Sequence, residues 1–327
     1  MTTFLYVLFL IIGIVLLVKG ADFFVDGASR VAKALKVPAL IIGLTIVSIG
    51  TSLPEASVSI NAVVGGNYAI SVANVVGSNI ANVWLILGLS AVFVPLAISK
   101  DMKRYDIPIL LALCAMFAVM CFVTSPYIID RIEAIIMFVI FIAYLVFLVL
   151  RAIKTAPKSD EKPGGEEVAE KKEKPLWLAI VLGVIGLGAV IFGGTCVVDS
   201  ASYIAEKLGM SQNLIGLTVV AVGTSLPELV TSVIAAIKKE GDIAIGNVVG
   251  SNIFNLVFIL GMSGTISPIT LVPEIWFDFI VMALAMVAVF AIAMFSKNMT
   301  RWQGITFAVV YVVYLALIIL RETVGIF

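Results

Sequence analysis

The fold is decided by a stretch of thirteen residues, GLTIVSIGTSLPE at positions 43–55, because it returns almost unchanged as GLTVVAVGTSLPE at 216–228. A second block behaves in the same way, since NVVGSNIAN at 74–82 recurs as NVVGSNIFN at 247–255. One offset of 173 residues relates both pairs, and the sequence around them aligns without a gap. The chain therefore contains an internal repeat.

Composition places this repeat in a membrane. The 327 residues are 61% apolar and only 13% charged, and the mean hydropathy is +1.17, whereas charged residues make up about a quarter of a soluble protein. A helix needs about 20 apolar residues to cross the hydrocarbon core. We predict ten such spans, at 4–26, 38–64, 69–97, 107–125, 130–151, 176–205, 212–237, 243–271, 275–295 and 303–321.

One long polar stretch, TAPKSDEKPGGEEVAEKKEKP at 155–175, divides the spans into two sets of five. We predict a first five-helix repeat at 1–152, a mobile cytoplasmic linker at 153–175 and a second repeat at 176–327. Because five is odd, the second repeat enters the membrane upside down. The predicted fold is an all-α membrane protein of two inverted five-helix repeats, with broken helices and a site near the midplane.

The basic residues predict the orientation. The loops after spans 1, 3, 5, 7 and 9, together with Arg151 at the end of span 5, hold 17 of the 21 Lys and Arg residues, which makes that side cytoplasmic by the positive-inside rule. We therefore expect a multi-pass protein of the cell membrane with both termini extracellular and no cleaved signal peptide. Beyond the lipid bilayer, neither a nucleic acid nor an obligatory protein partner is indicated.

Each first block carries a proline well inside a span. Pro54 and Pro227 cannot donate a hydrogen bond to the residue four positions earlier, which is Gly50 or Gly223, so each helix should break near GTSLP. Backbone carbonyls freed in a membrane are tolerated only where they are buried in protein or line a wet cavity. Carbonyl oxygen is a good ligand for a hard cation.

A glutamate follows each proline. Glu55 and Glu228 are the acids that lie deep within predicted spans, and no Lys or Arg lies at matching depth in both halves. A charge at that depth costs about 2.5–3.5 kcal/mol on insertion scales. A bound cation or protons could supply the missing positive charge.

Residues with neutral side-chain oxygens occur at regular spacing near these glutamates in the sequence. Thr51 and Ser52 precede Glu55 by four and three residues, which places them on its helix face. Their equivalents are Thr224 and Ser225, and the second blocks add stripes at four-residue spacing: Asn74, Ser78 and Asn82, then Asn247, Ser251 and Asn255. Proline kinks and small-residue stripes are common packing features, but two unpaired glutamates repeated in inverted halves favour a site. This oxygen set suits Ca²⁺, which takes 6–8 flexible oxygen ligands, better than Mg²⁺.

At these residues the chain resembles the cation/Ca²⁺ exchanger superfamily, specifically the prokaryotic sodium/calcium exchangers, whose alpha-repeat motifs are GTSLPE and GSNIxN. The resemblance implies that spans 2, 3, 7 and 8 are broken and form the ion-binding core, while spans 1 and 6 slide past it. It also implies a set of cation ligands that includes the backbone carbonyls of Ser48 and Ala221. The full predicted set is Ser48, Thr51, Ser52, Glu55, Ser78, Asn82, Ala221, Thr224, Ser225, Glu228, Ser251 and Asn255.

Asn255 departs from the family pattern, because many relatives have an acid there and that acid is linked with K⁺ dependence in one branch. The GTSLPE form itself implies Na⁺ rather than H⁺ coupling. Asp26 and Asp199 also match across the repeat, and we expect a helix-end or gating contact there rather than a ligand.

The predicted function is a secondary antiporter that exchanges Ca²⁺ for Na⁺ by alternating access, with both ions sharing ligands around Glu55 and Glu228. The main alternative is a proton-coupled exchanger of Ca²⁺ or another divalent cation; a passive channel is a further one. The chain has no histidine, and its three cysteines lack paired spacing, so no zinc or redox site and no cofactor are indicated. An enzyme is not expected, since no recognisable base accompanies the Ser and Glu residues.

Overall fold

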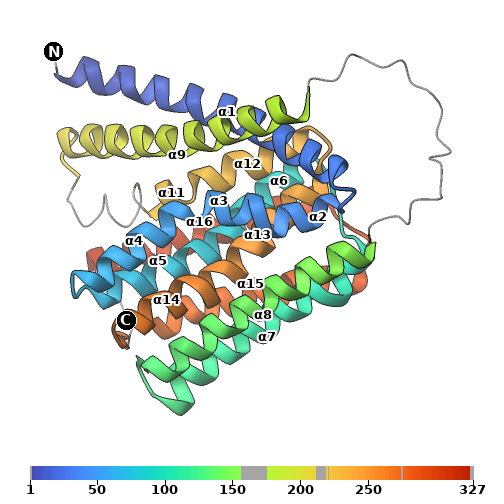
Figure 1. Ribbon diagram of the computed structural model, residues 1–327. Coiled ribbons are helices and arrows are strands. Elements are labelled where there is room, and N and C mark those ends of the chain that lie inside the picture. Colours follow the sequence, from blue (N-terminus) through green and yellow to red (C-terminus); the bar gives the residue numbers. More distant parts are fainter. Residues whose placement is uncertain (1, 156–174, 211–218, 220, 274, 325–327) are drawn as a thin grey trace.

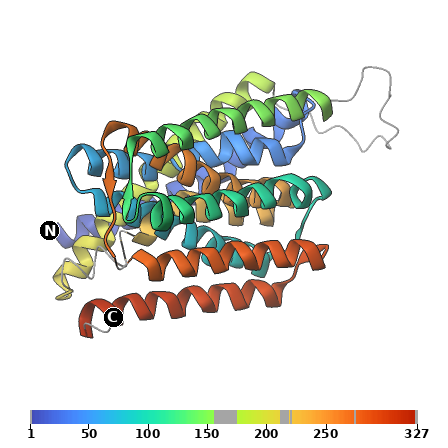
Figure 2. The same cartoon turned by 90° about the horizontal axis from the view of Figure 1, so that it is seen from below.

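A computed structural model describes residues 2–155, 175–210, 219, 221–273 and 275–324. In these residues the chain is helical apart from short connecting turns and four strands of two residues each, and the long helices run roughly along one direction (Figures 1 and 2). Most of the predicted linker therefore lies outside the described residues.

The first half contains helices α1 to α8 and two strands, with η marking stretches of π-helix. Their bounds are α1 Thr2–Ala34, α2 Ala39–Ile42, η1 Gly43–Val47, α3 Ser48–Thr51, α4 Leu53–Val64, α5 Tyr68–Ile80, η2 Ala81–Leu87, α6 Gly88–Phe93, β1 Leu96–Ala97, η3 Met102–Asp106, α7 Ile107–Val119, η4 Met120–Thr124, β2 Ile128–Ile129 and α8 Arg131–Thr155. The short elements α2, η1 and α3 follow one another without a break, as do α5, η2 and α6.

The second half repeats this order. Its elements are α9 Leu176–Lys207, α11 Ala221–Thr224, α12 Leu226–Ile237, α13 Gly241–Ile253, η6 Phe254–Ile259, α14 Leu260–Ile266, β3 Ile269–Thr270, α15 Ile275–Phe295, β4 Asn298–Met299 and α16 Arg301–Val324. Three helices of the first half, α3, α4 and α5, begin and end at the offset of 173 residues from α11, α12 and α13. The duplicated sequence thus folds into duplicated local structure.

Eight of the ten predicted spans correspond to continuous described helices that are long and apolar enough to cross a membrane. The predicted span at 38–64 is present as a bent pair, Ala39–Thr51 and Leu53–Val64, with an angle of 48° between its parts. The remaining predicted span, 212–237, is described only for Val219, α11 and α12. Residues 211–218 and 220 lie outside the described part, and they include most of the GLTVV segment of the second repeat.

Spans 3 and 8 differ from the expectation that they are broken. Tyr68–Phe93 and Gly241–Ile266 are each continuous, and both change from α-helix to π-helix, at Ala81 and Phe254. A π-helical turn inserts extra backbone without ending the helix and often occurs at functional sites. These two helices are therefore widened rather than interrupted.

The same two helices form the centre of the molecule. The apolar stretches of Tyr68–Phe93 and Gly241–Ile266 are 78% and 94% buried, against 22–39% for the other continuous spans. In Figure 1 they lie between the α1–α9 pair on one side and α7 and α8 on the other. Both copies of the second sequence block therefore lie inside the protein, away from lipid.

The paired strands connect opposite halves. β1 pairs antiparallel with β4, and β2 pairs antiparallel with β3, so each pair joins a strand of one half to a strand of the other. The two pairs lie at opposite ends of the helices (Figure 2). Exchange of the halves converts one pair into the other.

Helices α1 and α9 pack closely because glycines line the contact. A Cβ atom added to Gly20 would lie 2.7 Å from the Gly186 carbonyl oxygen, and one added to Gly193 would lie 2.8 Å from the Gly13 carbonyl oxygen. Such distances are too short for real side chains, so any larger residue would push the helices apart. The two helices therefore form one tightly packed pair.

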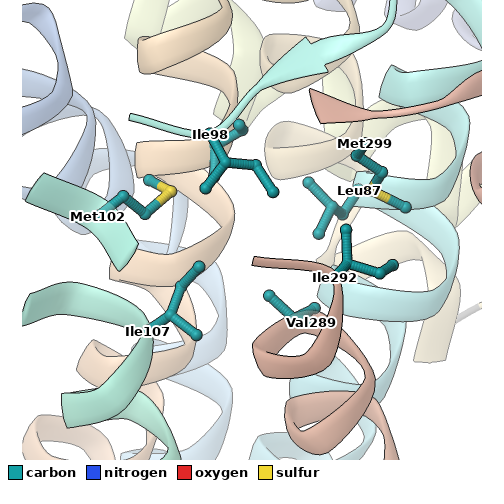
Figure 3. Close-up of a pocket in the computed structure, with 8 residues that line it drawn as sticks. Leu87, Ile98, Met102, Ile107, Val289, Ile292 and Met299 are labelled. Carbon is teal, nitrogen blue, oxygen red and sulfur yellow. The ribbon is translucent and has the colours of Figure 1, made fainter. Parts of the chain in front are cut away.

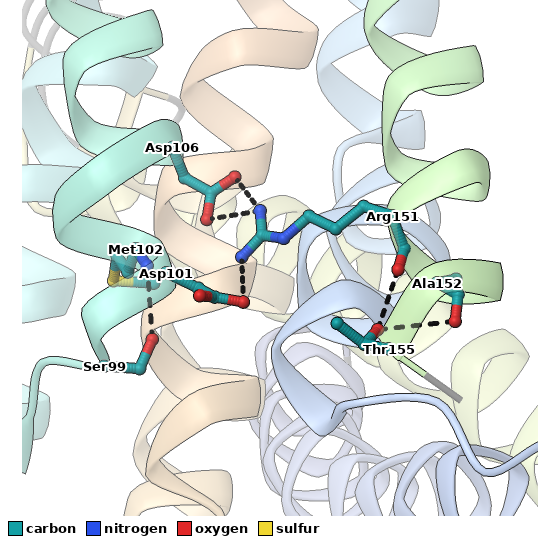
Figure 4. A network of polar contacts seen from close by, with 7 residues as sticks. All are labelled: Ser99, Asp101, Met102, Asp106, Arg151, Ala152 and Thr155. Carbon is teal, nitrogen blue, oxygen red and sulfur yellow. Dashed lines mark hydrogen bonds and ion pairs between the residues drawn. The ribbon is translucent and has the colours of Figure 1, made fainter. Parts of the chain in front are cut away.

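A third repeated block escaped the sequence comparison because its offset is shorter. YLVFLVLR at 144–151 recurs as YLALIILR at 314–321. In the first copy, Arg151 bonds Asp106 at 2.8 Å and Asp101 at 3.3 Å (Figure 4). In the second, Arg321 contacts Asp278 at 3.4 Å. Each ion pair ties the start of one peripheral helix to the end of the next, so α7 is joined to α8 and α15 to α16.

Candidate cation site

The two GTSLPE motifs break their helices in the same conformation. Ser52 has φ −85° and ψ 8°, and Ser225 has φ −88° and ψ 7°, between the short helices α3 and α11 and the longer helices α4 and α12. Pro54 and Pro227 are the second residues of α4 and α12, where a missing N–H is harmless. The predicted breaks are thus confirmed at Ser52 and Ser225.

Each break places a glutamate in the first turn of the following helix. Glu55 is 1% exposed and Glu228 is fully buried. The Ser52 hydroxyl donates to Glu228 Oε1 at 2.8 Å, and the Ser225 hydroxyl donates to Glu55 Oε1 at 3.3 Å. Each serine therefore contacts the glutamate of the opposite half, and the two motifs form a single reciprocal cluster.

Several oxygens of this cluster have no hydrogen-bond partner although they are buried. A buried polar atom left unpaired costs about 1–3 kcal/mol, so such atoms normally find partners. Five of them belong to the predicted ligand set: Glu55 Oε2, Asn82 Oδ1, Thr224 Oγ1, Glu228 Oε2 and Asn255 Oδ1. All five are oxygens, and four of them form two pairs related by the repeat. A bound cation would give all of these oxygens a partner.

The Ser48 carbonyl lies beside this cluster. It accepts hydrogen bonds from the Ser52 backbone N–H at 3.0 Å, from Thr51 Oγ1 at 3.4 Å and from Ser251 Oγ at 3.5 Å. This carbonyl therefore keeps its helical bond to Ser52 and lies between Thr51 and Ser251, and its role as a ligand stays a prediction. Its equivalent, Ala221, is the first residue of α11; its side chain lies outside the described part.

Two asparagines form hydrogen bonds to the backbone next to the breaks. Asn74 Nδ2 donates to the Glu55 backbone carbonyl at 3.1 Å, and Asn247 Nδ2 donates to the Glu228 carbonyl at 3.4 Å. Asn247 Oδ1 also accepts the Thr51 hydroxyl at 3.0 Å. These first members of the predicted stripes thus hold the backbone of the glutamates. Ser78 and Ser251 occupy matching buried positions one turn further along.

The charges near the site are negative. Within the described residues, the ion pairs of Lys and Arg involve other acids, Asp22, Asp26, Asp101, Asp106 and Asp278, and no cluster of three or more His, Cys, Asp or Glu occurs. The charged groups of the cluster are therefore the two glutamate carboxylates, and its other oxygens are neutral.

A separate pocket near β1 and β4 is lined by apolar side chains such as Ile98 and Met299 (Figure 3) and offers a cation no ligand.

The sequence comparison missed two residues of the cluster. Asn79 and Asn252 are fully buried, and each accepts a hydrogen bond from a predicted ligand of the opposite half. Both lie within the quoted GSNI motifs, so the sequence pattern includes these residues. It does not predict their hydrogen-bond partners, because contacts between halves depend on how the repeats dock.

These features define a membrane protein with a buried, doubly acidic site that suits a cation. Comparison with known proteins names its family: the model of the sodium/calcium exchanger protein family matches residues 5–150 and 178–320, one segment in each half. The chain belongs to this family. It is therefore a cation/Ca²⁺ exchange antiporter of the prokaryotic type, and the predicted superfamily is confirmed.

Individual relatives agree over most of the chain. The sodium/calcium exchanger MaX1 of Methanosarcina acetivorans is 36% identical over 95% of this chain and 97% of its own. The putative antiporter CaxA of Alkalimonas amylolytica is 37% identical, over 80% of this chain and 81% of its own. Solved structures of the sodium-calcium exchanger NCX_Mj superpose with TM-scores of 0.82–0.83 at 32% identity, and one soaked with 10 mM Na⁺ and 10 mM Sr²⁺ covers 96% of this chain and 98% of its own.

Proposed function

We propose that this protein exchanges Ca²⁺ for Na⁺ by alternating access, and that both ions compete for ligands around Glu55 and Glu228. The observation that carries this proposal is the reciprocal pair of serine–glutamate bonds, because each glutamate keeps a second buried oxygen with no partner. The proposed ligand set is the twelve residues predicted from the sequence.

Charge supplies the coupling. Two ionised glutamates give the site a charge of about −2, which one Ca²⁺ or several Na⁺ would neutralise. An empty site of that charge is expensive to enclose away from water. The protein should therefore change between its two open states readily only when loaded, and that restriction converts two separate ion movements into exchange.

The moving parts of the proposed cycle are the α1–α9 pair and the rest of the protein. The glycine contact makes the pair a unit, and a small apolar cluster of Leu17, Ala21 and Val190 is separate from the main core. A sliding motion of this pair against the rest of the protein would leave the glycine contact intact. We place the chain in the cell membrane as two inverted five-helix repeats, 1–152 and 176–327, with cytoplasmic linker 153–175 and extracellular termini.

The test is uptake of radioactive Ca²⁺ into proteoliposomes that contain the purified protein. Vesicles loaded with Na⁺ should accumulate Ca²⁺, whereas vesicles loaded with K⁺ or choline at the same osmolarity should not. Uptake driven by a pH gradient and indifferent to Na⁺ would replace this proposal with proton-coupled exchange, since protons also neutralise glutamates. Flux without any counter-ion would identify a passive channel instead.

A further inference from the structure

Four buried asparagines form a network between the two central helices. Asn82 Nδ2 donates to Asn252 Oδ1 at 2.9 Å, and Asn255 Nδ2 donates to Asn79 Oδ1 at 3.0 Å. Asn79 Nδ2 also donates to the Asn252 backbone carbonyl at 3.4 Å. All four side chains are at most 1% exposed. The asparagines of each half therefore pair with those of the other half.

The direction of these hydrogen bonds determines which atom of each amide stays available to bind a cation. An asparagine carries an NH₂ group that only donates and an oxygen that only accepts, and only the oxygen can bind a cation. Because Asn252 and Asn79 use their oxygens to hold the NH₂ groups of Asn82 and Asn255, the oxygens of those two residues stay free. Both free oxygens are buried and without a partner.

We propose that Asn79 and Asn252 are positioning residues, each of which orients the ligand amide of the opposite half so that its oxygen faces the cation. The inference rests on the proposed function, in which Asn82 and Asn255 are ligands. Reversal of either ligand amide would direct an NH₂ group at the ion. Each half thus supplies ligands of its own and orients one ligand of the other half.

The alternative role is polar packing between α5 and α13, and the pairing pattern separates the two. A positioning role couples Asn252 to Asn82 and Asn79 to Asn255, which are partners across the halves. It predicts weaker coupling between Asn79 and Asn82, because Asn79 holds the amide of Asn255 and not that of Asn82. Packing alone would couple the contacting amides in stability without a change in Ca²⁺ affinity.

The experiment is calorimetric titration of Ca²⁺ into the full-length protein in detergent, without Na⁺. We expect Asn252→Leu to weaken Ca²⁺ binding about tenfold, as loss of an outer-shell partner does at metal sites. The double variant Asn82→Leu/Asn252→Leu should bind no more weakly than Asn82→Leu alone, because no amide is then left to orient. In the control Asn82→Leu/Asn79→Leu, the two fold-changes should come closer to multiplying, because Asn79 does not orient Asn82.

Multiplying effects in both cycles would overturn the positioning role. Asn252→Asp keeps an acceptor oxygen, and we expect its affinity to be within about threefold of wild type or tighter; a loss equal to that of Asn252→Leu would contradict the inference. If Asn252→Leu does not fold, the mirrored cycle of Asn255 and Asn79 gives the same test. Wild-type affinity in Asn82→Leu and Asn255→Leu would refute the proposed ligands themselves, whereas loss in those variants alone would refute only the positioning.

Discussion

The two halves of the chain bring matching residues to the site, but they contact the α1–α9 pair differently. α1 packs extensively along α12, whereas the equivalent packing of α9 on α4 is at most slight. Two inverted repeats with identical surroundings would make both contacts or neither. The site is thus nearly symmetric, whereas its packing against the α1–α9 pair is not.

Polar contacts follow the same asymmetry. Lys238, at the end of α12, bonds Asp22 at 2.7 Å and Asp26 at 2.6 Å, and Ser29 donates to Glu240 at 2.6 Å. The position equivalent to Lys238 in the first half is Gly65. Asp26, predicted to be a helix-end or gating contact, therefore has a charged partner at the linker end of the helices.

The equivalent surface of α9 has no such link in the described residues. Asp199 takes the place of Asp26, and the Ser202 hydroxyl, which corresponds to that of Ser29, is buried without a partner. The repeat therefore accounts for the site, whereas residues outside the repeated blocks account for the unequal contacts with the α1–α9 pair. In the proposed cycle, the Lys238 link would hold the cytoplasmic end of this pair against α12.

The largest expected effect tests the symmetric part. Glu55→Gln and Glu228→Gln keep the shape of the side chain and remove one of the two charges. Changes in outer-shell partners alone reduce metal affinity 10–100-fold, so we expect each variant to lose more than about 100-fold in Ca²⁺ affinity and to fall to background in the proteoliposome assay. Near-normal exchange by one variant would mean that the halves do not share a site.

The next effect concerns the two peripheral ion pairs, which are equivalent in sequence but not in burial. Asp106 is fully buried and the Arg151 side chain is 7% exposed, whereas Asp278 and Arg321 are 13% and 22% exposed. Removal of one partner from a buried pair costs about 3–5 kcal/mol. Arg151→Met should therefore lower the melting temperature in detergent more than Arg321→Met. Equal shifts would show that burial does not separate the pairs.

A smaller effect compares the two serine–glutamate bonds. A hydrogen bond to a charged group contributes about 1.5–3 kcal/mol, so we expect Ser52→Ala to weaken Ca²⁺ binding about tenfold. Ser225→Ala should have less effect, since its bond to Glu55 is 3.3 Å long against 2.8 Å for Ser52. Ser90→Ala, at a buried hydroxyl without a partner, is the matched control and should bind normally.

The smallest effect tests the asymmetric part. Partly exposed ion pairs contribute about 0.2–1 kcal/mol, so Lys238→Gln should shift the balance of the two open states by at most about fivefold. Hydrogen–deuterium exchange should then rise in α1 and at the end of α12. Gly65→Lys, which gives the first half a lysine at the position equivalent to Lys238, should shift the balance in the opposite direction. Identical exchange in all three proteins would exclude a role for this link.

The sequence predicted the helix breaks because proline acts locally. The bends at Ser52 and Ser225 need only the loss of one N–H four residues after a glycine, and the spans follow from hydropathy alone. The π-helical segments at Ala81 and Phe254 were not predicted, because they depend on packing along the central helices. The ligand assignments remain a proposal.

Contacts between halves could not be predicted for a different reason. The bonds of Ser52 to Glu228 and of Asn82 to Asn252 join residues about 170 positions apart. A sequence repeat does not specify how its two copies pack against each other. The third block was missed because its offset differs from that of the first two. A search that allows gaps would detect it through Tyr144 and Arg151, which match Tyr314 and Arg321.

The central claim is that Ca²⁺ and Na⁺ occupy one shared site built by both halves. Calorimetric titration of Ca²⁺ into wild-type protein at rising Na⁺ concentration tests it most directly, with choline to hold the ionic strength constant. A shared site predicts that the apparent Kd for Ca²⁺ rises steadily with Na⁺, more steeply than in direct proportion because several Na⁺ replace one Ca²⁺. An apparent Kd that does not change with Na⁺ would contradict it.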